Sequence, residues 1–497
     1  MMNMDKTLSS LSPLSRSTPL RLVALAAATL LAGCALGPEY AGPPDAAPQA
    51  QRSGQFVRAG DLANATAPLN RWWEALNDAQ LNHLVQLALQ ANPNLGSARA
   101  RLQQSRANLD LEQANAAPSV GASALAAHAR LPPANLGALT GGSSSGGSSA
   151  SSVNLYNLGV DASWEADLFG AHRRAIQAAG ASAQAAEASL ADVQVSLTAE
   201  VVNAYINLRD RQQRLALGEQ SLQAQQDMLA LTGQRVQRGT ASSLDQIRVQ
   251  NQLDATRAEL LPLQAEREAY LNQLATLLGQ EPGTLDAELN GAAPLPLPPQ
   301  QVAVGDPVAL LRRRPDVRAA ERTLAADTAR IGQAEAARYP SLKLFGVIGL
   351  GGTHPSDLTR LDDFVALGAP MLSWNFLDFG RAKARVTQAE QVRDEAEMKY
   401  RQAVLEALRD AEDSLSRFRY GRITVATLAR SKASADRALA LARQRYQAGT
   451  GTLIEVLDTT RQQITAQQNL LQAEANLTRS FVGIQKALGL GWGDAAS

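Results

Sequence analysis

The segment Gln234-Arg-Val-Gln-Arg-Gly-Thr240 returns 210 residues later as Gln444-Arg-Tyr-Gln-Ala-Gly-Thr450. The same offset holds for further residues on both sides of this segment: Trp164 with Trp374, Phe169 with Phe379, Gly170 with Gly380, and Leu278-Gly279 with Leu488-Gly489. Self-similarity at a fixed distance is the signature of a chain built from repeats. The sequence therefore predicts a tandem duplication.

Upstream of Trp164 the offset between the copies is larger. Pro93 and Pro118 return as Pro315 and Pro340, 222 residues later. The two offsets differ by 12 residues, the length of the Gly/Ser-rich run Gly141–Ser152 of the first copy. Because Gly and Ser give the chain no stiffness, we expect this run to be a flexible insertion.

The sequences of the two copies predict the same order of elements: a helix, a strand pair, a very long helix, a Gly-Thr turn and a returning helix. In the first copy the pattern predicts helices at 95–116, 171–237 and 244–279 and strands near 119–130 and 157–164. The second copy repeats this order, with its first helix at 317–337 and its strands near 341–351 and 364–374. A helix of roughly 67 residues is about 100 Å long, whereas the shorter helices reach about 36 and 54 Å. Two short helices stacked end to end therefore match one long helix.

Apolar residues of the long helices recur at spacings of three and four. They are Leu190, Val193, Leu197, Val201, Ala204 and Leu208 in the first copy, and Tyr400, Ala403, Ala407, Ala411, Ser414 and Phe418 at the matching positions of the second. A stripe this narrow is typical of a coiled-coil seam. Periodicity alone also fits a plain helical bundle.

The N-terminus predicts export and lipid attachment. Basic residues precede the apolar run Leu22–Leu31, which is too short to span a bilayer and ends at Ala32-Gly33-Cys34. Leu31-Ala32-Gly33-Cys34 resembles the bacterial lipobox, and Cys34 is the only cysteine, so acylation suits it better than redox chemistry. Ala35 in place of Asp after the cysteine indicates onward transfer to the outer membrane.

Composition narrows the remaining classes. Lys plus Arg and Asp plus Glu are 47 each, so no basic excess favours a nucleic acid as partner.

Beyond the signal no run of about 18 apolar residues predicts a membrane helix, so a membrane crossing requires strands closed into a barrel. Four strands are too few for a barrel, which requires about eight or more, and the shortage predicts an oligomer. Two soluble hairpins are the alternative, against which stand the lipid site and the aromatic cluster of Trp374, Phe376 and Phe379.

We divide the chain by these patterns. The predicted parts are a signal peptide 1–33, an extended N-terminal segment 34–77, a first repeat 78–280, a Pro-rich linker 281–307, a second repeat 308–490 and a tail 491–497. Both Pro-rich parts are expected to run as extended chain around the middle of the helical region.

The chain resembles the TolC-like outer-membrane factors, in particular the NodT-type (OprM-like) lipoprotein branch. The motifs that carry the resemblance are Cys34-Ala-Leu-Gly-Pro-Glu-Tyr40, Trp72-Trp73, Leu311-Arg-Arg-Arg-Pro-Asp-Val-Arg-Ala-Ala-Glu321, Ile331-Gly332 and the two Gly-Thr turns. The resemblance implies a mixed α/β membrane channel: a homotrimer with a 12-stranded β-barrel in the outer membrane and a long α-helical barrel in the periplasm. It also implies two partners, a periplasmic adaptor and an inner-membrane pump of the resistance–nodulation–division type.

Charged residues follow the second turn at three-residue steps. Glu455, Asp458 and Arg461 project from one side of a helix, which on a bland interpretation is a solvated face with weak i,i+3 pairs. The resemblance implies instead a periplasmic gate made of Arg445, Tyr446, Ile454, Glu455, Asp458 and Arg461, with Asp245 tying neighbouring helices. Gly451 departs from members that place a gate arginine there.

The turns Gly239-Thr240 and Gly449-Thr450 are predicted to dock the adaptor, because both copies keep them while their flanks diverge. The alternative is that Gly-Thr only ends one helix and caps the next.

No residues predict catalysis or a cofactor other than the lipid. His83, His128, His172 and His354 are scattered without metal-ligand spacing, so a passive channel is expected. The competing functions are an exporter of peptides or proteins with the same fold, a structural coiled-coil lipoprotein, the adaptor itself, and a secreted enzyme. An adaptor is expected to have one helical hairpin flanked by soluble β-domains. The sequence predicts export of drugs or other small toxic compounds by family resemblance, but no residue pattern identifies the cargo, pump or adaptor.

Overall fold

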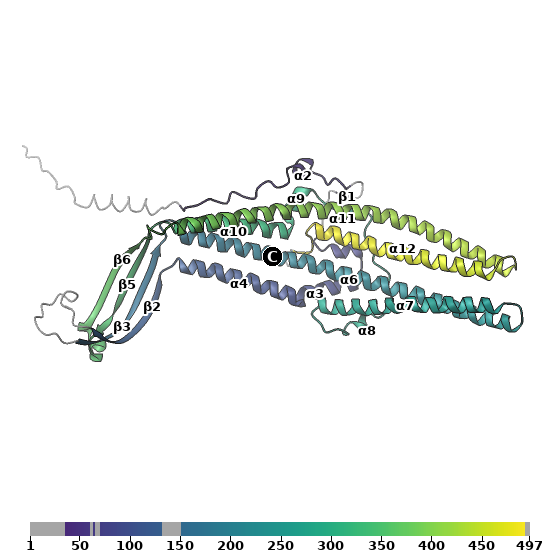
Figure 1. Ribbon diagram of the computed structural model, residues 1–497, viewed down its shortest axis with the longest axis horizontal. Coiled ribbons are helices and arrows are strands. Elements are labelled where there is room, and N and C mark those ends of the chain that lie inside the picture. Colours follow the sequence, from purple (N-terminus) through teal and green to yellow (C-terminus); the bar gives the residue numbers. More distant parts are fainter. Residues whose placement is uncertain (1–34, 60–62, 65–69, 132–150, 493–497) are drawn as a thin grey trace, which may run out of the picture. The chain divides into compact units, whose positions relative to one another are not determined.

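The computed structural model describes residues 35–59, 63–64, 70–131 and 151–492 (Figure 1). The predicted signal peptide 1–33 and the predicted lipid site Cys34 lie outside these residues, as does most of the Gly/Ser-rich run. The end of that run is not part of an insertion, because β3 begins at Ser151 and continues to Ala166. Residues 151–163 of β3 pair antiparallel with β2 (Ser119–Leu131), which extends the strand beyond the predicted 157–164.

The two copies have the same helices and strands. The first contains α4 (Pro93–Asn115), β2 (Ser119–Leu131), β3, α6 (Ala171–Gln237) and α7 (Ser243–Leu277). The second contains α10 (Pro315–Ala336), β5 (Ser341–Gly352), β6 (Phe364–Ser373), α11 (Arg381–Gln447) and α12 (Leu453–Ala487). Both long helices have 67 residues and both returning helices have 35, which confirms the predicted duplication of elements.

The compact units of the chain are not the two copies. Of the described residues, unit 1 combines 35–41, 107–131, 151–181 and 325–394, and unit 2 combines 42–59, 63–64, 70–106, 182–324 and 395–492. Each unit thus takes segments from both copies, so neither copy forms a compact body alone. Among the described residues, no helix is both long and apolar enough to cross a membrane.

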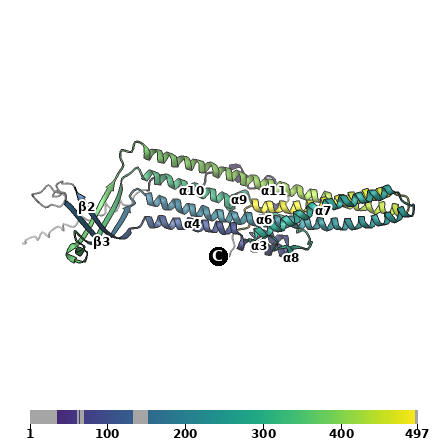
Figure 2. The ribbon, with the colours of Figure 1, turned by 60° about the horizontal axis from the view of Figure 1, so that its bottom comes forward.

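Unit 1 contains one antiparallel sheet in the order β2-β3-β5-β6 (Figure 1), of which Figure 2 shows β2 and β3 from another side. The two hairpins have the same register: Ser119 lies opposite Ser163 in the first, and Ser341 lies opposite Ser373 in the second. Even-numbered residues share one face, on which Leu158, Val160 and Ile348 are about half exposed, at 51%, 49% and 58%. Successive side chains of a β-strand alternate between the two faces of the sheet, which places these three side chains on the same face.

Unit 2 has a core that joins both copies. The predicted helical stripe is buried at Leu197, Val201, Ala204 and Leu208 of α6 and at Tyr400, Ala407, Ala411 and Phe418 of α11. Trp72 lies 6.0 Å from Phe481 of α12, measured between ring centroids, in an edge-to-face arrangement. Large aromatic side chains bury much apolar surface, and these hold the N-terminal segment against the second copy.

The N-terminal segment and the linker are not extended throughout. The first contains α2 (Pro48–Ser53) and a 3-10 helix η2 (Trp72–Leu76), and the second contains α8 (Asp286–Leu289). Burial of Trp72 and Trp73 requires the chain to turn inward at η2, which explains the departure. The two parts meet in a short parallel pair of β1 (Ala63–Asn64) and β4 (Val302–Ala303), and η2 leads into α3 (Ala79–Ala91).

Short helices meet end to end in both copies. Asn92 accepts a hydrogen bond from the Leu95 amide at the start of α4 (3.1 Å) and donates one to the Leu277 carbonyl at the end of α7 (2.8 Å). Arg314, between α9 (Pro307–Arg313) and α10, donates to the Ala487 carbonyl at the end of α12 (3.1 Å). The last carbonyls of a helix have no partner within the helix, so both side chains satisfy them across the junction.

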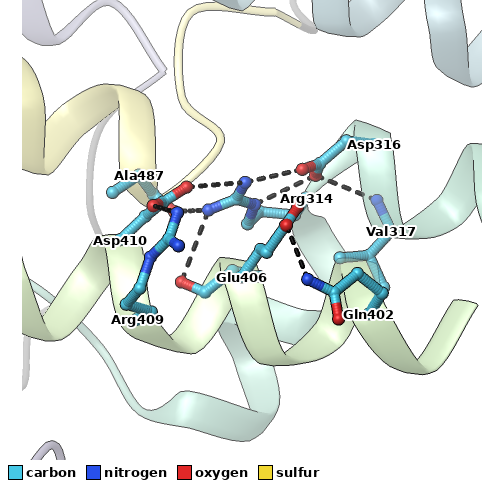
Figure 3. Close-up of polar contacts among 9 residues, drawn as sticks. Arg314, Asp316, Val317, Gln402, Glu406, Arg409, Asp410 and Ala487 are labelled. Carbon is cyan, nitrogen blue, oxygen red and sulfur yellow. Dashed lines mark hydrogen bonds and ion pairs between the residues drawn. The ribbon is translucent and has the colours of Figure 1, made fainter. Parts of the chain in front are cut away.

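Arg314 is held by acidic groups (Figure 3). Its guanidinium lies 2.5 Å from the Asp316 carboxylate and 3.5 Å from that of Asp410. The surrounding pocket of about 230 Å³ also contains Asp192 and Lys486. Burial raises the pKa of Asp192, Asp316 adds to the rise, and Arg314 and Lys486 oppose it.

Candidate functional site

The two Gly-Thr turns have the same backbone geometry. Gly239 and Gly449 adopt φ of 69° and 73°, a left-handed conformation that glycine adopts without the steric cost of a Cβ. The Thr240 amide donates to the Arg235 carbonyl at 2.8 Å, and the Thr450 amide donates to that of Arg445 at 3.0 Å. These bonds close a Schellman motif, which ends each long helix.

The threonine side chains take part in the same closure. The Thr240 hydroxyl donates to the Arg235 carbonyl (3.1 Å), and the Thr450 hydroxyl donates to the Arg445 carbonyl (3.2 Å). The shared Gly-Thr sequence of the two turns therefore has a structural cause, which is independent of any binding partner.

Each returning helix begins with a capping box. The Asp245 amide donates to the Ser242 hydroxyl at 3.1 Å, and the Glu455 amide donates to the Thr452 hydroxyl at 3.2 Å. The two carboxylates accept from the amides of Ser242 and Thr452 at 3.3 and 3.4 Å. Asp245 and Glu455, which the family resemblance assigns to the gate, thus also cap these helices, a role that the pattern Ser/Thr-x-x-Asp/Glu could have predicted but that was missed.

The predicted gate charges pair within the chain. The Arg461 guanidinium lies 2.8 Å from the Asp458 carboxylate, and that of Arg445 lies 3.9 Å from Glu455. Asp245 lies 3.8 Å from Arg248 of its own helix. The paired side chains are largely exposed, so each pair contributes only about 0.2–1 kcal/mol. The pairs leave the charges available for other contacts.

Tyr446 joins the two copies near the turns. Its hydroxyl accepts a hydrogen bond from the Arg235 guanidinium, whose Cζ lies 5.2 Å from the ring centroid. Ile454, the second residue of α12 beyond the Gly-Thr turn, is 49% exposed. In the sequence Arg235 stands out only as part of the repeated motif, because no local pattern reveals a partner 211 residues away.

Gly451 has little room for a side chain. A Cβ atom there would lie 3.1 Å from both the Arg445 Cβ and the Tyr446 amide nitrogen. The chain passes this close because the Gly451 amide donates to the Arg445 carbonyl at 3.1 Å. A side chain at this position would therefore require the neighbouring atoms to move by a few tenths of an ångström.

The residues after the predicted lipid site are held in unit 1. The Leu36 amide donates to the Phe169 carbonyl (3.3 Å), and the buried Arg174 guanidinium donates to the carbonyls of Leu36 (2.9 Å) and Gly37 (3.1 Å). Position 384, which matches Arg174 in the second copy, is an alanine. Only the first copy therefore has the arginine that binds the chain after Cys34.

No metal centre is evident in the part of the chain that the structure describes, where no group of three or more His, Cys, Asp or Glu side chains could hold an ion.

Both copies match one protein family. The family model described as "Outer membrane efflux protein" covers residues 84–280 and 307–490. This chain belongs to the outer membrane efflux protein family. It is accordingly an outer-membrane protein of the efflux class with the TolC-like channel fold, which confirms the predicted resemblance and localisation.

Two relatives are similar to this chain over nearly their whole length. "Nodulation protein T" of Rhizobium leguminosarum bv. trifolii is 28% identical over 468 residues, covering 94% of this chain and 96% of that protein. "Antibiotic efflux pump outer membrane protein ArpC" of Pseudomonas putida is 29% identical over 469 residues, covering 94% of each chain. The solved outer-membrane channel OprN has a TM-score of 0.84 and 34% identity, covering 92% of this chain and 99% of that one.

Proposed function

We propose that this protein is the outer-membrane exit channel of a three-component efflux system. A periplasmic adaptor would connect it to an inner-membrane pump of the resistance–nodulation–division type. The observation that carries the proposal is the family match over both copies, together with full-length similarity to the OprN channel.

The proposed assembly is a homotrimer. Three chains would contribute four strands each, and about eight or more strands are required to close a membrane barrel. Exposed apolar and aromatic side chains of unit 1 support contact with lipid: Leu158, Val160, Ile348, Leu372, Trp374 and Phe376.

The proposed cargo is drugs or other small toxic compounds, in agreement with the name of the antibiotic efflux relative. We propose passive transport without catalysis or a cofactor, driven by the partner pump. Deleting the gene should lower the minimum inhibitory concentration of pump substrates, and purified protein should form single channels in planar bilayers. Unchanged drug sensitivity together with loss of a secreted peptide or protein would favour the rival exporter. Absence of channels would favour a structural lipoprotein.

We propose that Cys34 is the acylated N-terminus. The described residues that follow it, Leu36 and Gly37, accept hydrogen bonds from the Arg174 guanidinium in unit 1. Mass spectrometry of membrane-extracted protein should find diacylglycerol and an amide-linked acyl chain on Cys34. A mature N-terminus at another residue without lipid would refute the assignment.

We propose that the residues around Ile454, Glu455 and Asp458 close the channel at rest. In a trimer each would form a ring, and gathered carboxylates attract multivalent cations. Glu455→Gln is the informative variant, because Gln also completes a capping box while the charge is lost. Glu455→Gln with Asp458→Asn should weaken block by hexamminecobalt in single-channel recordings. Unchanged block would leave these charges as a solvated helix face.

The proposed gate also contains two residues, Asp245 and Arg445, that would connect neighbouring helices in the closed state. Asp245→Asn with Arg445→Gln should raise single-channel conductance and sensitise cells to a large antibiotic such as vancomycin. Arg257→Gln, on the exposed face of α7, is the control for a general charge effect. Equal conductance in parent and double variant would exclude Asp245 and Arg445 as ties.

We propose that the turns Gly239-Thr240 and Gly449-Thr450 bind the adaptor. Thr240→Lys with Thr450→Lys should abolish efflux and adaptor co-purification, since a charged chain enters an exposed contact while both glycines remain. Thr240→Val with Thr450→Val removes the same hydroxyl–carbonyl bonds without charge and should keep most efflux. Full efflux in the lysine double variant would remove the docking role.

A further inference from the structure

One pocket of unit 2 gathers positive charges without matching negative ones. It has a volume of about 610 Å³, and its charged lining residues are Arg312, Arg313, Arg318 and Asp306. Three guanidinium groups and one carboxylate leave an excess of two positive charges, in a chain whose Lys plus Arg equals its Asp plus Glu. We call this the cationic pocket.

The neighbouring Arg314 shows what the cationic pocket lacks. The Arg314 guanidinium is buried beside the carboxylates of Asp316 and Asp410. The two preceding residues, Arg312 and Arg313, form no ion pair with any residue that the structure describes. Carboxylates of the chain therefore neutralise the buried arginine of this run, and the described residues supply none for the other two.

The end of α9 explains the position of only two of these cations. Arg312 and Arg313 lie in the last turn of α9, where the helix dipole favours positive charge. Arg318 is the fourth residue of α10, near the end of a helix at which the dipole disfavours positive charge. Helix dipoles therefore do not account for all three arginines in one pocket.

The other lining groups leave the guanidinium groups available. Asp306 caps α9, since its carboxylate accepts a hydrogen bond from the Ala309 amide at 2.8 Å. The Arg318 Cζ lies 5.2 Å from the centroid of the Trp492 ring, and the Trp492 indole donates to the Gly489 carbonyl at 2.8 Å. This cation–π contact positions the Arg318 guanidinium, and its N–H groups reach no acceptor among the described residues.

We propose that the cationic pocket binds a small multivalent anion that carries phosphate or carboxylate groups. A cleft lined by charge of one sign concentrates ions of the opposite sign. The planar guanidinium donates two parallel hydrogen bonds to either group, which makes arginine suited to both. The volume of about 610 Å³ falls within the range of roughly 300–1,000 Å³ found for small-molecule sites.

A bound anion would connect four segments of unit 2. The lining residues come from the chain before η2, which supplies Asn70, from α9, from α10 and from the chain after α12, which supplies Trp492. A ligand that binds only the folded protein stabilises it by mass action. The anion should therefore raise the melting temperature of the protein.

Calorimetric titration of the full-length protein in detergent tests the proposal. Sodium pyrophosphate and sodium citrate, each at constant ionic strength, are the two probes, and their relative affinities distinguish phosphate from carboxylate recognition. We expect at least one probe to bind the parent and to raise its melting temperature.

A pocket variant and a matched control locate the binding. The pocket variant combines Arg312→Gln, Arg313→Gln and Arg318→Gln, and it should bind the probe at least about 10-fold more weakly, since each arginine supplies charge-assisted hydrogen bonds. The control removes the same charge from three exposed residues of α11 and should bind like the parent: Arg430→Gln, Arg437→Gln and Arg443→Gln. If the pocket variant does not fold, Arg318→Gln alone should still weaken binding by about 3-fold or more.

The other outcomes would overturn the proposal. Equal weakening in the pocket variant and the control would show that the probe responds only to net charge. Absence of binding to the parent would remove the site. A response that appears only after Asp494→Asn would show that a carboxylate of the chain itself is the counter-ion of the pocket. The inference is independent of the proposed exit channel, because binding is measured without transport.

Discussion

At the residue scale, Arg314 and Asn92 have the same task in the two copies. Both satisfy a terminal carbonyl of the returning helix, at Ala487 and Leu277. The arginine adds ion pairs to Asp316 and Asp410, so the second junction depends on charge where the first depends on a neutral amide.

Arg314→Ala should therefore destabilise the protein by about 2 kcal/mol, because charge-assisted hydrogen bonds to a buried guanidinium are lost. Denaturant unfolding in detergent measures the change. Arg312→Ala, an exposed neighbour on α9, is expected to have little effect. A cost for Arg314→Ala no larger than that control would show that the junction does not depend on the arginine.

Asp192 gives a prediction with a pH dependence. Its pKa is raised above 3.8 in the folded protein, chiefly by burial, so the ionised carboxylate lowers stability. This cost is present where both folded and unfolded states are ionised, and it disappears as pH falls through the raised pKa.

Asp192→Asn should accordingly raise the free energy of unfolding at about pH 7, and its advantage over the parent should shrink as the pH falls through the raised pKa. Urea unfolding at several pH values measures this, with Asp227→Asn, an exposed carboxylate of the same helix, as control. An advantage that stays constant with pH would rule out titration of Asp192 as the cause.

At the element scale, the helix termini around the turns are stabilised locally. The Schellman motifs and capping boxes satisfy the free carbonyls and amides at both ends of each turn. The turns are consequently formed by the chain itself and do not require a partner in order to fold.

Ser242→Ala and Thr452→Ala should each cost about 1 kcal/mol, since each removes the side chain that accepts a free amide in the first turn of a helix, that of Asp245 or Glu455. Hydrogen exchange in the first turn of α7 or α12 measures the loss. Ser243→Ala, one residue further along α7, keeps the cap and is expected to leave exchange unchanged. Equal exchange in Ser242→Ala and Ser243→Ala would contradict the capping assignment.

At the scale of the whole molecule, the copies are interdependent. The core of unit 2 includes Tyr205 and Leu274 from the first copy and Phe418 and Phe481 from the second. Phe418 and Phe481 lie 6.4 Å apart between ring centroids, and Phe481 also contacts Trp72 of the N-terminal segment.

A chain containing only residues 308–492 should therefore fail to fold, because its share of this core would face water. Circular dichroism should show no cooperative melting for this fragment alone. Co-expression with residues 1–307 should restore a stable complex, since the cut falls next to the linker. Cooperative melting of the isolated second copy would refute this interdependence.

Much of the architecture could be read from the sequence. The offset of 210 predicted equal long helices, and α6 begins and ends where the pattern placed it, at Ala171 and Gln237. Repetition and helical periodicity are properties of the sequence itself, so they can be recognised without knowledge of tertiary contacts. The capping residues Ser242 and Thr452 could also have been predicted, because a capping box spans only four residues, but this pattern was missed.

Only the tertiary structure decided which distant residues meet. The partners of Arg314 at Ala407 and Ala487 are 93 and 173 residues away, and Tyr446 reaches Arg235 across 211 residues. No local pattern encodes such pairs, since they depend on how whole helices pack. The division into units that mix both copies has the same cause: each copy exposes apolar faces that the other covers, so the sequence determined the repeated elements and packing between the copies determined the compact units.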